Sequence, residues 1–106
     1  MARESRSASG YKRTVCDSVA RSTVASLATG QTLLPANDSR VHVTIFNDST
    51  SVLYLAWGTA PTTTNFTAKI PAQGMYELPA MPLVYVGPIT GVWATADGSA
   101  RITEVV

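Results

Sequence analysis

Apolar and polar residues alternate along much of this chain, most clearly in residues 40–58, RVHVTIFNDSTSVLYLAWG. One run places Val41, Val43 and Ile45 in one phase, and a second run after the polar residues NDST alternates in the same way. Successive side chains of a strand point to opposite faces of a sheet, so each run predicts a strand. The short polar joint between the two runs predicts that they form a β-hairpin.

Shorter runs of the same kind follow, separated by Pro, Gly, Asn and Asp: FTAKI, MYEL, LVYV, ITGVWAT and ARITEVV. Upstream, the β-branched residues around Thr23 and the pair Leu33-Leu34 predict two short strands. A short helix between residues 14 and 34 also fits the pattern. The pair Asp97-Gly98 predicts a second hairpin, which would join the last two runs.

Proline positions and strand spacing set the expected architecture. Proline cannot donate to a sheet ladder, so Pro79 and Pro82 predict that a strand at residues 83–86 lies at the edge of its sheet. About eight short strands, punctuated every ~8–12 residues, are typical of an all-β domain. We therefore predict a small antiparallel β-sandwich or barrel that spans residues 23–106 and requires no helix.

The first part of the chain differs from this body. Residues 1–13, MARESRSASGYKR, have no helical or strand period, and Tyr11 is their one sizeable apolar residue. Such a segment cannot bury enough surface to offset its ordering entropy, so we expect it to be disordered in isolation. We assign residues 1–22 to an extended basic N-terminal arm. Five basic and two acidic residues up to Arg21 give a net charge of +3, whereas three basic and five acidic residues after it give −2.

The basic arm admits three interpretations: it binds nucleic-acid phosphates, it contacts neighbouring protein subunits, or it is a solvated tail. Five cations diluted by two carboxylates are a weak signal for nucleic acid, so we expect an assembly arm. Its candidate partner-binding residues are Arg3, Arg6, Tyr11, Lys12, Arg13 and Arg21.

Reactive groups are few. The only histidine, His42, lies on an expected strand, and the only cysteine, Cys16, excludes an intrachain disulfide. No Gly-rich phosphate loop, metal-ligand cluster or local nucleophile–base pair occurs. We therefore expect a non-enzymatic protein with no catalytic residues, no cofactor and no metal. No apolar run reaches the ~18 residues of a membrane-spanning helix, and the N-terminus lacks the apolar block of a secretory signal.

Composition points instead to binding. Only 14% of the residues are charged, against the ~25% typical of soluble domains, which fits either burial against other chains or a small neutral β domain. The aromatic residues of the body allow an alternative, a sugar-stacking platform that uses an exposed Trp57 or Trp93. In a sandwich of this size, however, large aromatic rings are needed first as core or subunit interface.

Several spaced motifs occur together: Arg40 ahead of TIFNDS, a Leu-Tyr strand that ends in Gly58, the segment YELP, and YVGPITGVWATADGSARITEV. They resemble a group of small β proteins encoded in the structural gene modules of tailed bacteriophages. The residues that match this pattern, all within residues 33–105, are Arg40, Asn47, Tyr54, Gly58, Tyr76, Glu77, Gly87, Gly91, Trp93, Gly98, Thr103 and Glu104.

The resemblance implies a virion component made in the host cytoplasm, most simply a head (capsid) decoration or minor head-associated protein. Its expected partners are the major capsid or other virion proteins and further copies of itself, with no role for a membrane or nucleic acid. We expect it to dock through the N-terminal arm and through sheet edges at residues 83–86 or 101–106. A carbohydrate- or host-surface-binding β module of a phage tail or fibre is the alternative.

Overall fold

The computed structural model describes residues 2–6, 12–16, 18–79 and 83–106, the first two segments as backbone only. These residues contain ten strands and no helix, and so no helix that could cross a membrane. The strands are β1 (Ala2–Arg6), β2 (Lys12–Cys16), β3 (Val19–Ala25), β4 (Gln31–Leu34), β5 (His42–Asp48), β6 (Leu53–Trp57), β7 (Ala68–Ile70), β8 (Met75–Glu77), β9 (Ile89–Trp93) and β10 (Ser99–Val105).

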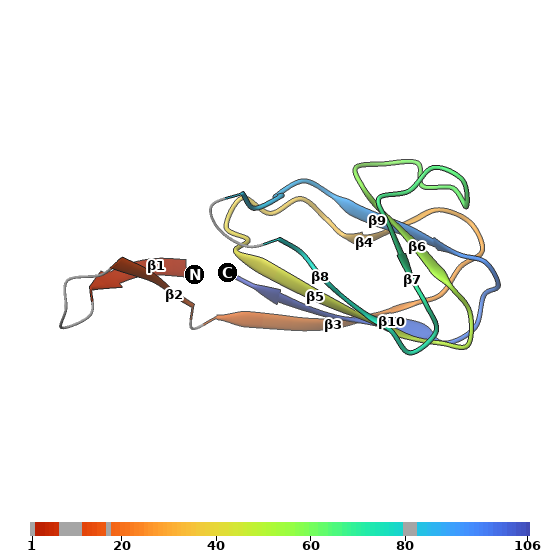
Figure 1. The fold of residues 1–106 in the computed structure, drawn as a ribbon, viewed down its shortest axis with the longest axis horizontal. Coiled ribbons are helices and arrows are strands. Elements are labelled where there is room, and N and C mark those ends of the chain that lie inside the picture. The colour runs from red at the N-terminus through yellow and green to blue at the C-terminus, as the bar shows by residue number, and fades with distance from the viewer. Residues whose placement is uncertain (1, 7–11, 17, 80–82) are drawn as a thin grey trace.

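Eight of the strands form two antiparallel four-stranded sheets that face each other (Figure 1). One sheet has the order β3-β10-β5-β8 and the other the order β4-β9-β6-β7. This arrangement confirms the predicted all-β sandwich. The pairing is nested: β6 pairs with β7, β5 with β8, β4 with β9, and β3 with β10. A long hairpin that is rolled up in this way is a jelly roll.

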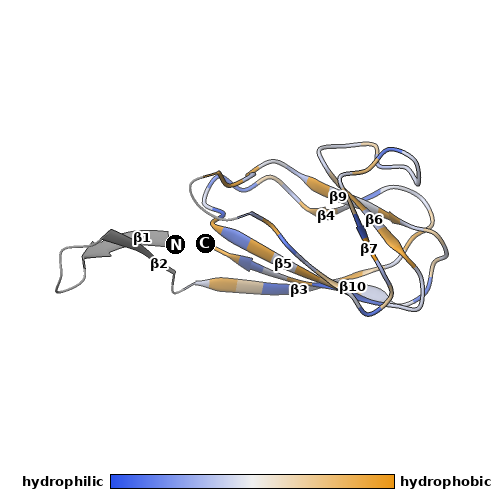
Figure 2. Cartoon of the chain, in the orientation of Figure 1, coloured by the Kyte–Doolittle hydropathy of each residue, from blue (hydrophilic) through white to orange (hydrophobic). Residues whose placement is uncertain are grey.

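Alternating burial along the longer strands builds the core. In β5, Val43, Ile45 and Asn47 are buried and the residues between them are half-buried on the outer face. Hydrophilic and hydrophobic segments both occur along β5 in Figure 2, and in its first part the outward His42 and Thr44 alternate with the inward Val43 and Ile45. In β10, Ala100 and Ile102 are buried in the same way, and β9 is buried at all five positions. These side chains meet between the sheets, where removing them from water supplies the main drive for folding.

Both predicted hairpins of the body are wrong. β5 and β6 lie in different sheets, and so do β9 and β10, which flank Asp97-Gly98. The alternating runs are strands as predicted, but the nested fold pairs each of them with a strand from elsewhere in the sequence. Gly98, at φ +67°, belongs to a link between the sheets, where an added Cβ would collide with the Asp48 carbonyl oxygen.

Both predicted sheet edges are also wrong. Residues 83–86 form no strand: within this segment the Tyr85 carbonyl accepts from the Arg40 side chain and the Val86 carbonyl accepts from the Asn37 N–H. β10 lies in the middle of its sheet, between β3 and β5. The actual edges are β3 and β8 in one sheet and β4 and β7 in the other.

The N-terminal segment differs from the expected arm in its local structure. Residues 2–6 and 12–16 pair as an antiparallel hairpin, which projects from the end of the sandwich where the C-terminus lies (Figure 1). Residues 19–22, which we assigned to the arm, form the first half of β3 and pair with β10. A two-stranded hairpin alone is marginally stable in water, so its sequence carries only a weak signal.

Arg40 ties together one end of the sandwich. Its buried guanidinium donates to the Glu104 carboxylate on β10 (2.8 Å). It also donates to the carbonyls of Pro35 (2.7 Å), Tyr85 (3.1 Å) and Gly87 (2.8 Å). These carbonyls belong to the links β4–β5 and β8–β9, each of which passes from one sheet to the other. One side chain therefore joins both links to β10, a central strand of its sheet.

Asn47 has the same role at the other end. Its amide nitrogen donates to the carbonyls of Ser51 (2.8 Å) and Ile70 (3.0 Å), and its oxygen accepts from the Trp93 indole (3.0 Å) and the Ser49 hydroxyl (2.7 Å). The side chain is fully buried. Buried polar groups must be paired in this way, because an unpaired one costs about 1–3 kcal/mol.

Replacing Arg40 by methionine tests this function of the guanidinium. We expect Arg40→Met to lower the free energy of unfolding by about 3–5 kcal/mol, because Glu104 and three carbonyls lose their donor. Urea unfolding measures the change. Lys69→Met, at an exposed cation, is the control and should stay within about 0.5 kcal/mol of the wild type. An equally small effect of Arg40→Met would contradict this account.

Candidate assembly interface

The reactive side chains of the body do not come together. His42 lies on the outer face of β5, opposite Val105, and its Nδ1 is buried with no hydrogen-bond partner among the residues that the structure describes. Asp97 accepts from the Thr50 backbone N–H (2.8 Å) and hydroxyl (2.9 Å), which joins the β9–β10 connection to the β5–β6 connection. No group of three or more His, Cys, Asp or Glu that could hold a metal ion occurs within the described residues. Cys16 ends the backbone-only strand β2.

Several residues that carry the family resemblance support the fold. Arg40, Glu104, Asn47 and Trp93 form the two buried networks described above. The sequence contains a signal, which we did not use, that Asn47 and Glu104 are buried. Asn47 lies in the same phase as the buried Val43 and Ile45, and Glu104 lies in the same phase as Ala100 and Ile102. A polar residue in the apolar phase of a strand indicates a buried group that needs a partner.

Three of the four sheet edges are blunted. β7 and β8 have three residues each and are joined through Pro71, and β7 carries Lys69. β4 has four residues, a register shift between Thr32 and Leu34, and Pro35 at its end. Short strands, charged side chains (lysine above all), proline and bulges are the usual devices that keep another strand from pairing with an edge. β3 is the least protected: it carries the charged Arg21, but it has seven residues, no proline and a continuous register with β10.

The hydrogen bonds at the two ends of β3 show which of its backbone groups face β10. The Ser26 N–H donates to the Gly98 carbonyl (3.1 Å), and the Val106 N–H donates to the Ser18 carbonyl (3.0 Å). Bonded and non-bonded pairs alternate along an antiparallel ladder. The even-numbered residues of β3 therefore bond to β10, and the odd-numbered ones direct their N–H and C=O groups away from it.

One further contact supports this assignment. The Ala25 carbonyl accepts from the Gln31 side chain (2.7 Å), so an odd-numbered carbonyl does face away from β10. Among the described residues, no hydrogen bond reaches the outward backbone groups of Val19, Arg21 or Thr23. β3 thus presents an open row of donors and acceptors at the edge of its sheet.

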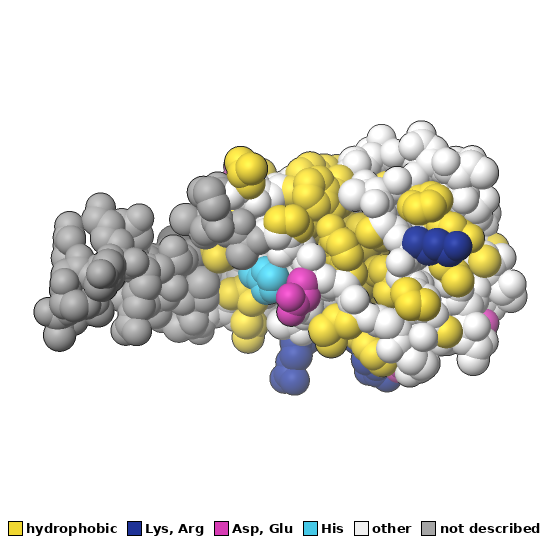
Figure 3. Space-filling model, in the orientation of Figure 1, with side chains coloured by type: hydrophobic (Ala, Val, Ile, Leu, Met, Phe, Trp, Pro, Cys, Tyr) yellow, Lys and Arg dark blue, Asp and Glu magenta, His cyan; other side chains and the backbone are white. Residues whose placement is uncertain are grey.

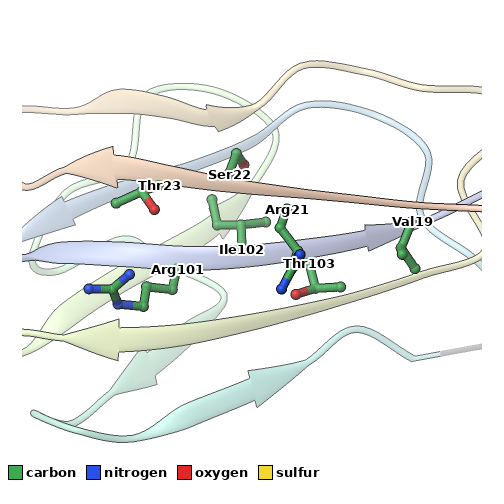
Figure 4. Close-up of a pocket in the computed structure, with 7 residues that line it drawn as sticks. All are labelled: Val19, Arg21, Ser22, Thr23, Arg101, Ile102 and Thr103. Carbon is green, nitrogen blue, oxygen red and sulfur yellow. The ribbon is translucent and has the colours of Figure 1, made fainter.

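A groove of about 670 Å³ follows this edge (Figure 4). Arg21 extends from β3 and Arg101 from the neighbouring strand β10, and the described residues that line the groove include no carboxylate. Arg101 donates to Asp48 on β5 (2.7 Å), and this bond lowers the pKa of the Asp48 carboxyl. Arg21 has no ion pair among the described side chains. The groove residues are Val19, Arg21, Ser22, Thr23, Arg101, Ile102 and Thr103.

The predicted partner-binding residues are distributed over three strands. Arg3 and Arg6 lie in β1, Lys12 and Arg13 lie in β2, and Arg21 lies in β3. Tyr11 falls outside the described residues. Two residues separate the end of β2 at Cys16 from the start of β3 at Val19. The basic segment therefore leads directly into the open edge. The sequence indicated Arg21 but not the edge itself, which depends on long-range pairing.

A second exposed feature is aromatic. Trp57 stacks on Tyr85 with ring centroids 5.1 Å apart at 9°, and its indole N–H donates to the Tyr76 hydroxyl (3.1 Å). The Trp57 and Tyr85 rings, together with Pro79 and Leu83, which is 81% exposed, line an apolar depression of about 370 Å³. Figure 3 shows how widely hydrophobic side chains are spread over one face of the body, with few charges among them. Trp93, by contrast, is buried and unavailable to a ligand.

Comparison with known proteins returns no relative: no family model, no curated protein and no solved structure matches this chain.

Two proline substitutions test which backbone groups of β3 are open. Thr23→Pro removes an outward N–H, so we expect the free energy of unfolding to stay within about 1 kcal/mol of the wild type. Ser22→Pro removes an N–H that bonds to β10, and we expect it to cost about 1–3 kcal/mol more than Thr23→Pro. Urea unfolding of both variants decides the point. The reverse order of stabilities would show that the opposite set of groups is open.

Proposed function

We propose that this chain is a non-enzymatic structural protein of a tailed-bacteriophage virion, most simply a head decoration or minor head-associated protein. It docks on the major capsid or other virion proteins and acts as a homo-oligomer. The observation that carries the proposal is the combination of a long edge strand without proline or bulge, β3, with the basic segment that leads into it. The sequence suggested docking edges at residues 83–86 and 101–106, and in this proposal β3 is the docking edge in their place.

The composition and the described side chains support binding over chemistry. Few residues are charged. His42 lies on the outer face of a sheet, Asp97 joins two connections between the sheets, and Asp48 and Glu104 form ion pairs. A jelly roll occurs in viral capsid proteins and also in lectins. Because one fold hosts many functions, the fold favours neither over the other, and the proposal depends on the edge and its charge.

The alternative function is binding of a carbohydrate or host surface at Trp57. Its partial exposure, 37%, and the depression beside it favour this reading. A sugar site, however, needs a free ring face together with polar groups that converge on the ligand. Tyr85 covers one face of Trp57, and the indole N–H already donates to Tyr76. Sugar binding by the wild-type chain that is lost in Trp57→Ala would favour the alternative.

Neutralising the basic segment tests the docking function. We expect the combined variant Arg3→Gln, Arg6→Gln, Lys12→Gln and Arg13→Gln to bind purified particles that lack the protein at least about tenfold more weakly at low salt, because oppositely charged surfaces steer and hold a complex. Cosedimentation with the particles measures the binding. Deletion of residues 1–13 should weaken it at least as much.

The matched control is Lys69→Gln, which removes an exposed cation from β7, at the edge of the other sheet. It should bind the particles as the wild type does. Undiminished binding after deletion of residues 1–13 would count against an arm that anchors the protein.

A further inference from the structure

We infer that β3 accepts an extended, acidic segment of a partner protein as a fifth strand of its sheet. This deepens the proposed function and rests on it for the identity of the partner as a virion protein. The partner strand would bond to the outward N–H and C=O groups of Val19, Arg21 and Thr23. Addition of a strand to an exposed edge is a recurrent mode of peptide recognition, in which the backbone gives affinity and alternate side chains give specificity.

The register determines which side chains of the partner meet β3. Residues directly opposite each other in an antiparallel pair share a face of the sheet. Arg21 pairs with Thr103 and Thr23 with Arg101, so the odd-numbered residues of β3 lie on the outer face, with the groove beside them. Residues of the incoming strand that bond to these positions therefore project over the same face, next to Arg21.

The basic residues at and before the edge favour an acidic partner strand. Arg101 is engaged by Asp48 on β5, whereas Arg21 lies at the open edge without an ion pair among the described side chains. The chain before β3 adds four basic residues and two acidic ones up to Asp17. A partner strand with a carboxylate opposite Arg21 gains a charge-assisted contact, and a basic strand is repelled.

A second copy of this chain fits the edge less well. A two-fold axis at Ser22 would let two β3 strands bond through the largest number of outward N–H and C=O groups. In that arrangement Arg21 lies opposite Thr23 of the second copy. The two Arg21 side chains would then be diagonal neighbours, about 7–8 Å apart across the strands. This contact places like charges together on the outer face. We therefore assign the edge to a partner of opposite charge.

Short peptides test the inference directly on the full-length chain. The probe is a blocked heptapeptide with glutamate at alternate positions and threonine between them, and its matched control has lysine in place of each glutamate. We expect the acidic peptide to bind at least about tenfold more tightly than the basic one at low salt, as measured by isothermal titration calorimetry. Equal affinities would overturn the charge argument.

Two modifications test the strand pairing itself. Thr23→Pro in the protein, and N-methylation in the peptide of the amides that would bond to β3, should each weaken binding at least about tenfold. The methylated peptide keeps the test valid if the proline variant is unstable. Arg21→Glu should reverse the preference between the acidic and basic peptides. Binding that survives N-methylation, or a dimer of the protein that Thr23→Pro abolishes, would overturn the inference.

Failure of this inference can be told apart from failure of the proposed function. If the acidic peptide binds as expected but the protein does not bind particles, strand addition holds and the virion function fails. If the neutralised arm weakens particle binding but the acidic peptide does not bind, the virion function stands and this inference fails.

Discussion

The links between strands impose the main constraint on this fold, because every link in the body except β6–β7 passes from one sheet to the other. Carbonyls in such links lie at the ends of the sandwich, outside any ladder, and need donors when they are buried. Arg40 supplies these donors at one end, and Asn47 supplies them to the Ser51 and Pro71 carbonyls at the other. Both belong to one stretch of chain, just before β5 and within it. That stretch joins the two ends of the roll, and the rest of the sandwich depends on it.

This constraint explains why the sequence predicted the elements better than their arrangement. Alternation at β5 and β10 is strong enough to locate both strands, and it predicts the inward phase. Turn chemistry at Asp97-Gly98 is also visible, but a turn does not say whether the chain doubles back in one sheet or crosses to the other. The crossing is set by nested pairing, in which β3 and β10 meet from opposite ends of the body. No local pattern encodes that separation.

The candidate interface depends on the same long-range pairing, so only part of it could be predicted from the sequence. Arg21 was a candidate because of its charge. The open edge on which it lies depends on the pairing of β3 with β10 and on the protection of the other three edge strands. Pro35, Lys69 and Pro71 are ordinary surface residues in the sequence, and they gain meaning once three edges are known to be protected. A body that blunts three edges and leaves the fourth open, beside a basic segment, is suited to join another chain through that edge.

Residue-resolved amide hydrogen exchange in the isolated full-length chain tests this central claim most directly. If β3 is an open edge, the N–H groups of Val19, Arg21 and Thr23 exchange rapidly, while those of Ala20, Ser22 and Val24, which bond to β10, exchange slowly. Equal protection of both sets would mean that the edge is already covered. Equally fast exchange of both would mean that β3 is not held in the sheet, and either result would contradict the account.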